Sequence, residues 1–83
     1  MNILYFAWVR EQIGLDHEDV DPPTSVVDVA SLVAWLAVRS PGHATALGQP
    51  SRLRAAIDQK FSAMDAPIAG AREIALFPPV TGG

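Results

Sequence analysis

Residues 2–9 of the sequence, NILYFAWV, are almost entirely apolar. In a β-strand, successive side chains point to opposite faces of the sheet. As a strand, this segment would carry apolar side chains on both faces, with Ile3, Tyr5, Ala7 and Val9 on one and Leu4, Phe6 and Trp8 on the other. Such a strand is typical of the centre of a sheet that is covered on both sides. Because a chain of 83 residues has little material for two covers, a partner protein could supply the second one.

The segment REIALF at residues 72–77 predicts another hydrophobic strand near the end of the chain. Ile74 and Leu76 would share one face of this strand, and Ala75 and Phe77 would share the other. Since the first and last strands are the most hydrophobic, we expect them at the centre of the sheet and side by side. The long connection between them permits parallel pairing.

A helix is predicted between these strands by residues 24–40, TSVVDVASLVAWLAVRS. Thr24 or Ser25 would cap its first turn by accepting a hydrogen bond from a free backbone N–H, and Asp28 would complete a capping box. The Pro-Gly pair at residues 41–42 would end the helix. Four apolar residues recur at helical spacing and would form the buried face of the helix: Val29, Leu32, Val33 and Leu36.

Shorter segments complete the expected sheet. The acidic residues 14–21, GLDHEDVD, are typical of a solvated loop that runs into an edge strand. Residues 52–57 follow a period of two, and residues 58–60 suit the tight turn of a hairpin. Together these patterns predict a single α+β domain over residues 1–83, with a mixed sheet and one main helix packed across one of its faces.

The composition argues against several classes of function. The chain has nine Asp and Glu residues against six Lys and Arg, and a net charge of -3, so it lacks a basic surplus for binding nucleic acid or an anionic membrane. It contains no cysteine, which excludes disulfides, a thiolate nucleophile and thiolate-bound metal. No segment approaches the roughly 20 apolar residues of a membrane-spanning helix. We therefore expect a cytoplasmic protein.

Residues that commonly perform catalysis are not grouped in the sequence. His17 and His43 stand alone, no spacing of His, Asp and Glu suggests a metal site, and each histidine is expected at the surface. Glu18 and Asp19 are expected to be solvated within a loop. The sequence has no glycine-rich phosphate-binding loop and no nucleophile motif around a serine. The chain therefore offers no candidate set of catalytic side chains.

The last nine residues, ALFPPVTGG, are the exception. Proline donates no backbone hydrogen bond, so Pro78 and Pro79 would take the chain out of the sheet in an extended conformation. Gly82 and Gly83 lack side chains and would make a tip slim enough for a narrow channel. We therefore expect residues 78–83 to form a projecting tail whose one reactive group is the terminal carboxylate. Activation as a mixed anhydride with AMP would make that carboxylate an electrophile for a sulfur or an amine.

Two segments of the chain resemble the small subunits of molybdopterin synthase, a family of ubiquitin-like sulfur carriers. Residues 3–14, ILYFAWVREQIG, resemble the opening strand of the family and the residues that follow it. Residues 70–83, GAREIALFPPVTGG, resemble its more specific ending, a glycine and a strand followed by Phe-Pro-Pro-Val-Ser/Thr-Gly-Gly. The length matches along the whole chain. Two departures concern turns: the family usually has Gly-Asp-Glu where residues 70–73 are GARE, and Asp58 replaces a frequent asparagine.

The resemblance implies a β-grasp, ubiquitin-like fold and a non-catalytic subunit that donates sulfur within a sulfurtransferase complex. An ATP-using activating enzyme, similar to ubiquitin-activating enzymes, would adenylate the carboxylate of Gly83. A sulfur donor system would then convert that carboxylate to a thiocarboxylate. The tail residues Val80, Thr81 and Gly82 would insert into the large subunit of the synthase. There the sulfur would pass to cyclic pyranopterin monophosphate and build the dithiolene of molybdopterin.

The resemblance also implies how the subunit meets its partners. The family complex is a heterotetramer of two large and two small subunits, the catalytic side chains belong to the large subunit, and the small subunit binds no cofactor. The residues expected to contact a partner are Phe6, Phe77, Pro78 and Pro79.

Other functions stay open beside this one. The chain could carry sulfur for thiamine biosynthesis or tRNA thiolation, or act as a ubiquitin-like protein modifier. It could also be a plain binding module whose terminal Gly-Gly is incidental. The sequence Phe-Pro-Pro-Val at residues 77–80 favours the molybdopterin branch, because it is that branch which the ending resembles.

Overall fold

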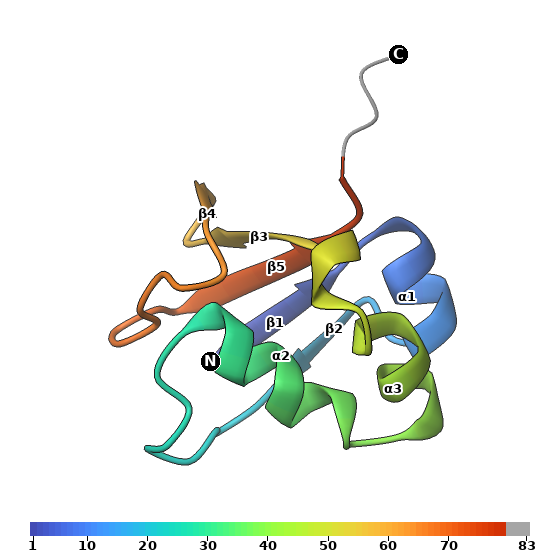
Figure 1. The fold of residues 1–83 in the computed structure, drawn as a ribbon, viewed down its shortest axis with the longest axis horizontal. Helices are drawn as coiled ribbons and strands as arrows, with labels where there is room; N and C mark the ends of the chain where they lie inside the picture. Colours follow the sequence, from blue (N-terminus) through green and yellow to red (C-terminus); the bar gives the residue numbers. More distant parts are fainter. Residues whose placement is uncertain (80–83) are drawn as a thin grey trace.

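The computed structural model describes residues 1–79, which form a five-stranded mixed sheet with helices on one side (Figure 1). In chain order the elements are β1 (Asn2–Tyr5), α1 (Ala7–Ile13), β2 (His17–Asp19), α2 (Val29–Ala37), α3 (Pro41–Leu47), the 3-10 helix η1 (Pro50–Arg52), β3 (Arg54–Ile57), β4 (Lys60–Ser62) and β5 (Glu73–Phe77). The strand order is β2-β1-β5-β3-β4. Strands β1 and β5 pair in parallel and the other neighbours pair antiparallel. The prediction that the first and last strands lie side by side in parallel is confirmed.

The first strand is shorter than its sequence suggests. It ends at Tyr5, and residues 7–13 form helix α1, so the prediction of a strand over residues 2–9 is wrong beyond Tyr5. Phe6 keeps an extended backbone as the N-cap, and Ala7 adopts a φ of 54°, which turns the chain out of the strand. Helix α1 then ends at Gly14, whose φ of 87° is the left-handed conformation that glycine adopts readily. Gly14 was thus the residue in the sequence that indicated a helix end, although the apolar residues before it were read as a strand.

Helix α2 begins later than expected, because its cap is Asp28 and not Thr24 or Ser25. The Asp28 carboxylate accepts a hydrogen bond from the Ser31 N–H at 2.8 Å, and the Ser31 hydroxyl accepts one from the Asp28 N–H at 3.1 Å. This reciprocal pair is a capping box in which serine takes the usual place of glutamate. Val27 and Asp28 meanwhile pair with the loop around residues 67–68, which keeps them extended. The predicted buried face of the helix is confirmed.

A third helix follows where the sequence predicted a loop or a short irregular turn of helix. Helix α2 ends at Ala37, and Pro41 opens helix α3 at a position where its missing N–H costs nothing. Ser40 caps α3 by accepting a hydrogen bond from the His43 N–H at 3.1 Å. A Cβ on Gly42 would lie 2.5 Å from the backbone oxygen of Gln12, so α3 packs closely against the end of α1. The main helix therefore ends before residues 41–42, as predicted, although it already stops at Ala37, and the same pair begins the next helix.

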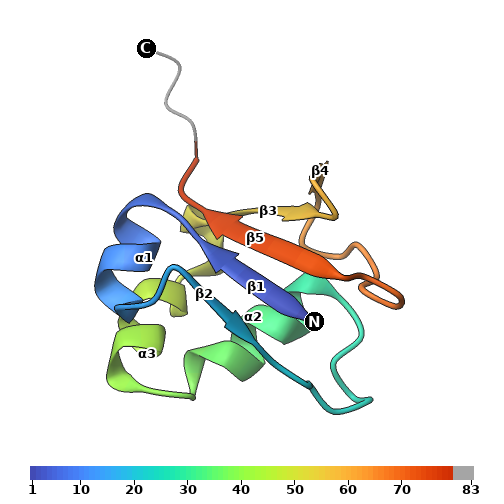
Figure 2. The ribbon, with the colours of Figure 1, turned by 180° about the vertical axis from the view of Figure 1, so that it is seen from behind.

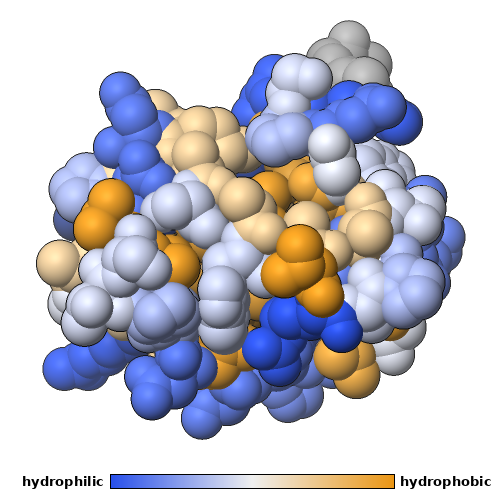
Figure 3. Space-filling model, turned by 60° about the horizontal axis from the view of Figure 1, so that its bottom comes forward, coloured by the Kyte–Doolittle hydropathy of each residue, from blue (hydrophilic) through white to orange (hydrophobic). Residues whose placement is uncertain are grey.

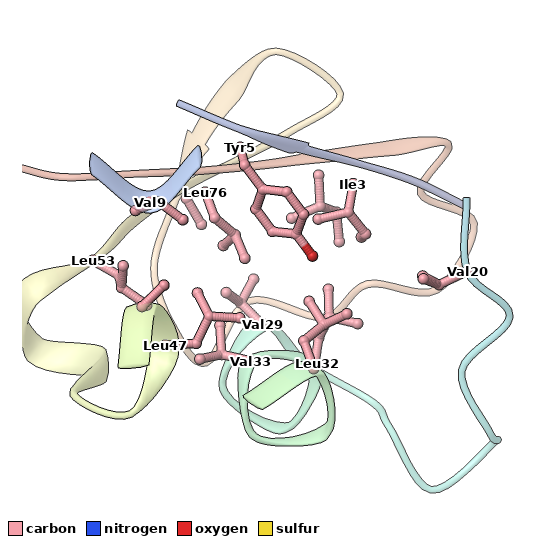
Figure 4. Packing of buried hydrophobic residues seen from close by; sticks show 14 of the residues in the cluster. Ile3, Tyr5, Val9, Val20, Val29, Leu32, Val33, Leu47, Leu53 and Leu76 are labelled. Carbon is pink, nitrogen blue, oxygen red and sulfur yellow. The ribbon is translucent and has the colours of Figure 1, made fainter. Parts of the chain in front are cut away.

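The core lies between the sheet and the helices. In Figure 4, side chains of β1 and β5 point toward those of α2, while Val9 of α1, Leu47 of α3 and Leu53 close the end of the cluster. The hairpin predicted around residues 58–60 is confirmed, with Asp58 and Gln59 at φ values of 48° and 72° in the turn between β3 and β4. The mixed sheet with α2 across one face is the expected α+β arrangement, the β-grasp fold, with α1 and α3 added to the one helix that was predicted. No helix within residues 1–79 is long and apolar enough to cross a membrane.

Candidate functional site

The helices cover one face of the sheet, and within residues 1–79 they leave the other face open (Figure 2). Ile3 and Ile74 are paired in the register and fully buried, so their neighbours along β1 and β5 point to the open face. The register aligns one side chain from each of four strands in a row across this face: Leu4, Ala75, Ala56 and Phe61. This row is apolar throughout, although it faces away from the core.

Three phenylalanines gather around the end of β5 on the open face. Phe61 is 84% exposed, and its ring centroid lies 5.8 Å from that of Phe77 with the planes tilted by 54°. Phe6 is 46% exposed, and its N–H donates a hydrogen bond to the Leu76 carbonyl at 3.2 Å, which holds it beside the same strand end. We call Phe6, Phe61 and Phe77, together with the row that includes Leu4 and the two alanines, the aromatic face.

The side of the molecule that is drawn in Figure 3 is mixed in polarity. On the side shown in Figure 3, hydrophobic side chains are interspersed with pale and blue ones, and the lower margin is largely hydrophilic. Exposed aromatic side chains next to one another are unfavourable in water and are enriched at protein–protein interfaces. The aromatic face is therefore the best candidate for a partner-binding site in the described part of the chain.

The structure describes four of the residues that the sequence assigned to partner binding. Phe77 closes β5, and Pro78 and Pro79 follow it outside the strand, all three half-exposed. Phe6 lies with them, as the shared backbone hydrogen bond to Leu76 shows. The proposed functional residues Val80, Thr81, Gly82 and Gly83 lie outside the described residues.

Phe61 was missed in the sequence. It follows Lys60 in the predicted hairpin, and the alternation of residues 52–57 was not continued across the turn. Once the hairpin register is known, Phe61 stands opposite Ala56 and diagonal to Phe77, on the open face. Its exposure was not foreseen, because a phenylalanine in a strand is more often buried.

A second group of polar side chains lies inside the molecule, beneath β1 and β2. The Glu18 carboxylate accepts hydrogen bonds from the Tyr5 hydroxyl at 2.7 Å and pairs with Nε2 of His43 at 2.6 Å. Its other oxygen lies 3.1 Å from Nη2 of Arg39. The Ser40 hydroxyl lies 2.7 Å from Nδ1 of His43, so both ring nitrogens have partners. We call Tyr5, Glu18, Arg39 and His43 the internal polar cluster.

This cluster corrects two predictions. His43 is only 5% exposed, so the expectation that it lies at the surface is wrong, whereas His17 is exposed as predicted. Glu18 points into the core side of the edge strand and does not solvate a loop. The sequence held no local sign of this pairing, because residues 18 and 43 lie on different elements that only the fold brings together.

The environment of the cluster shifts two pKa values. Burial raises the pKa of the Tyr5 hydroxyl, and the hydrogen bond to the Glu18 carboxylate raises it further. Burial alone would raise the pKa of Glu18, but hydrogen bonds from His43 and Tyr5 and the charge of Arg39 outweigh it and lower that pKa. Glu18 is therefore an ionised, fully paired carboxylate whose role is to join elements.

The described residues hold no other group that resembles a reaction centre. Residues 1–79 contain no set of three or more His, Asp or Glu side chains that could hold a metal ion. Two surface hollows of about 430 and 420 Å³ lie near Arg72 and near Val27, away from the Phe77 end of β5. The first hollow is lined by Asp58, Gln59, Arg72 and Glu73, whereas the second is lined mostly by apolar side chains.

Comparisons with known proteins agree with this geometry. The model of the ThiS family matches residues 3–83. The molybdopterin synthase sulfur carrier subunit of Escherichia coli is 40% identical over 85 aligned positions, covering 100% of this chain and 99% of that protein. The protein of the same description from Haemophilus influenzae is 34% identical, again covering 100% and 99%.

Solved structures share the fold. A structure from Pyrococcus furiosus, described as molybdopterin converting factor, subunit 1, superposes with a TM-score of 0.73 at 20% identity and covers 95% of both chains. SAMP1 from Haloferax volcanii superposes with a TM-score of 0.72 at 25% identity, covering 100% of this chain and 98% of that one.

Proposed function

The chain belongs to the ThiS family, and from this premise we propose that it is the sulfur carrier subunit of molybdopterin synthase. Its full-length relatives carry that description at 40% and 34% identity. The observation that carries the proposal is the aromatic face, which adjoins the start of a sequence ending in Gly82-Gly83. A carrier needs a docking surface near the group that it delivers, and the sequence that leads to Gly83 starts directly after Phe77 of this surface.

The chemistry would take place at the Gly83 carboxylate. An activating enzyme would join this carboxylate to the α-phosphate of ATP, forming an acyl adenylate and releasing pyrophosphate. Attack by hydrosulfide, supplied by the sulfur donor system, at the acyl carbon would then displace AMP and, after loss of a proton, leave a thiocarboxylate. ATP is thus a substrate of the activating enzyme and not a cofactor of this chain. The sulfur would pass to cyclic pyranopterin monophosphate in the synthase.

The large subunit of the synthase would contact the aromatic face. Phe77, Pro78 and Pro79 connect this face directly to the tail residues Val80, Thr81 and Gly82. Docking of the three phenylalanines would therefore set the position from which the tail enters the active site of the large subunit. Burying such rings is a common source of binding energy in protein interfaces.

Intact-protein mass spectrometry tests the proposal. The full chain is produced with and without the activating enzyme and the sulfur donor of the same organism. We expect the mass change of one oxygen replaced by one sulfur, located at Gly83, only when both are present. The thiocarboxylated chain is then mixed with the large subunit and cyclic pyranopterin monophosphate, and molybdopterin should form. Thiocarboxylate formation without molybdopterin would instead favour a carrier for thiamine or tRNA thiolation.

A further inference from the structure

Two arginines flank the aromatic face at the end of β5 where Phe77 lies. We propose that Arg52 and Arg54 form an electropositive rim that binds carboxylates on the protein partner, beside the site that receives the phenylalanines. This inference rests on the proposed function, because it concerns the same docking event. It adds the chemistry of the partner surface, which must combine an apolar site with acidic side chains at its edge.

Arg54 lies directly beside the aromatic face. It stands opposite Phe77 in the antiparallel register of β3 and β5, so its side chain leaves the sheet on the same, open side. Its Nη1 donates hydrogen bonds to the Leu53 carbonyl at 2.8 Å and the Ser51 carbonyl at 3.4 Å. These bonds hold one edge of the guanidinium against the backbone and leave the other edge exposed. An ordered guanidinium loses less entropy when it binds a carboxylate.

Arg52 is held in place by a different contact. Its guanidinium carbon lies 5.2 Å from the ring centroid of Trp8, within the range of a cation–π interaction. Trp8 belongs to α1 and lies two residues beyond Phe6. Figure 1 shows the yellow segment around residue 52 close to the red end of β5, with the start of α1 on its other side. Arg52 therefore lies near the same end of β5 as Arg54, between this end and the start of α1.

Neither arginine is neutralised by the described part of its own chain. Within residues 1–79 no carboxylate lies within 4.0 Å of the Arg52 or Arg54 guanidinium, whereas Arg39 pairs with Glu18. The chain has nine acidic residues against six basic ones, so these two arginines lack an ionic partner in the described part of the chain although carboxylates are in excess. Among residues 1–79 Arg72 also lacks an ion pair. It lies at the other end of β5 from Phe77, next to Glu73. Arg72 therefore provides a matched control.

Charges at the rim of an interface act mainly on the rate of association and its dependence on salt. The expected consequence is that the rim speeds up docking on a partner with acidic side chains and orients the tail before it enters. Stability of the free protein should depend only weakly on the rim, because both arginines are exposed and their contacts within the chain are surface contacts of small energy.

The test measures association kinetics with the large subunit of the same organism at low and high ionic strength. The variants are Arg52→Glu, Arg54→Glu, the charge-conserving Arg54→Lys and the control Arg72→Glu. We expect each rim reversal to slow association by about three- to ten-fold at low salt, a difference that shrinks at high salt. Arg54→Lys should retain most of the rate, and Arg72→Glu should change it much less than the rim reversals.

The outcomes separate this inference from the proposed function. If the unaltered chain binds the large subunit and the rim reversals slow association no more than Arg72→Glu does, the inference is overturned while the proposed function stands. If the unaltered chain does not bind the large subunit, the proposed function fails and the inference fails with it. Thermal unfolding of each variant, expected to match that of the unaltered chain, shows that a change in rate reflects the interface and not the fold.

Discussion

At the scale of single residues, exposure identifies function more clearly than residue type. Phe61 and Val38 are both strongly exposed, at 84% and 82%, yet only Phe61 lies against another aromatic ring. A single exposed apolar residue is ordinary, whereas neighbouring exposed rings on a sheet face indicate a contact surface. Phe61 is therefore the residue that the structure adds to the predicted site.

Replacing Phe61 with serine should weaken binding to the large subunit by about 1–3 kcal/mol, because a buried aromatic anchor is lost from the interface. The free energy of unfolding should change by less than about 0.5 kcal/mol, since the ring is already in water. Titration calorimetry and denaturant unfolding measure the two quantities. Val38→Ser is the control, and an equal loss of affinity in this variant would contradict the assignment.

At the scale of elements, two contacts decide how the helices sit on the sheet. The internal polar cluster joins β2 to α3 through Glu18 and His43, and the close approach of Gly42 joins α3 to α1. Both contacts connect elements that are distant in sequence. Both involve residues whose types are unremarkable in the sequence, so neither could be recognised before the fold was known.

Stability should depend on acid pH through Glu18. Because the folded-state pKa of Glu18 lies below its unfolded value, the unfolded chain binds the proton more readily as pH falls. The contribution of Glu18 is therefore present above the usual glutamate pKa of about 4.3 and is lost as pH falls through the lower, folded value. Thermal unfolding between pH 7 and pH 3 should show this loss.

The variant Glu18→Gln isolates this contribution. It keeps the size of the side chain but not its charge, and should destabilise the protein by about 1–3 kcal/mol at pH 7, because Arg39 and His43 lose an ionic partner. It should also show a weaker loss of stability below pH 5 than the unaltered chain. Asp19→Asn serves as a control on the same strand, because the Asp19 side chain is 86% exposed and its ion pair with the N-terminal ammonium group of Met1 is a surface pair of small energy. An identical acid profile for Glu18→Gln and the unaltered chain would refute the role of Glu18.

Replacing Gly42 with alanine should lower the free energy of unfolding by about 1–3 kcal/mol, as overpacking does in a close contact. The added Cβ would meet the Gln12 backbone oxygen at 2.5 Å, and backbone cannot move aside without shifting α1 or α3. Ala44→Ser, at an exposed position of the same helix, is the control and should have little effect. Denaturant unfolding measures both. Equal stability of the two variants would show that α3 can shift without cost.

At the scale of the whole molecule, the two faces of the sheet differ: one is buried in the core and the other is open to a partner. The helices bury one face in the core, and the other bears the aromatic face, the rim arginines and the residues that lead to the tail. The prediction that a partner supplies a second cover concerns this open face. The apolar run that prompted it was partly misassigned, since Trp8 and Val9 belong to α1.

Removing Gly82 and Gly83 should abolish thiocarboxylate formation and leave the free energy of unfolding within about 0.5 kcal/mol of the full chain. Within residues 1–79 the hydrophobic core ends at Leu76, so we expect the deletion to remove the reactive group without a loss of packing. Mass spectrometry and thermal unfolding are measured on the same preparations. A large loss of stability would show that the last residues serve the fold.

The sequence by itself determined the order of the strands and of helix α2, the central position of the first and last strands, the buried face of α2 and the ending that suggests a carrier. These features follow from local periodicity and turn chemistry, or from a motif that is contiguous in the chain. Only the tertiary structure decided that Phe61 joins Phe6 and Phe77, that His43 pairs with Glu18, and that Trp8 supports Arg52. Each of these contacts depends on strand register or helix placement, which bring together residues far apart in the sequence and leave no local pattern.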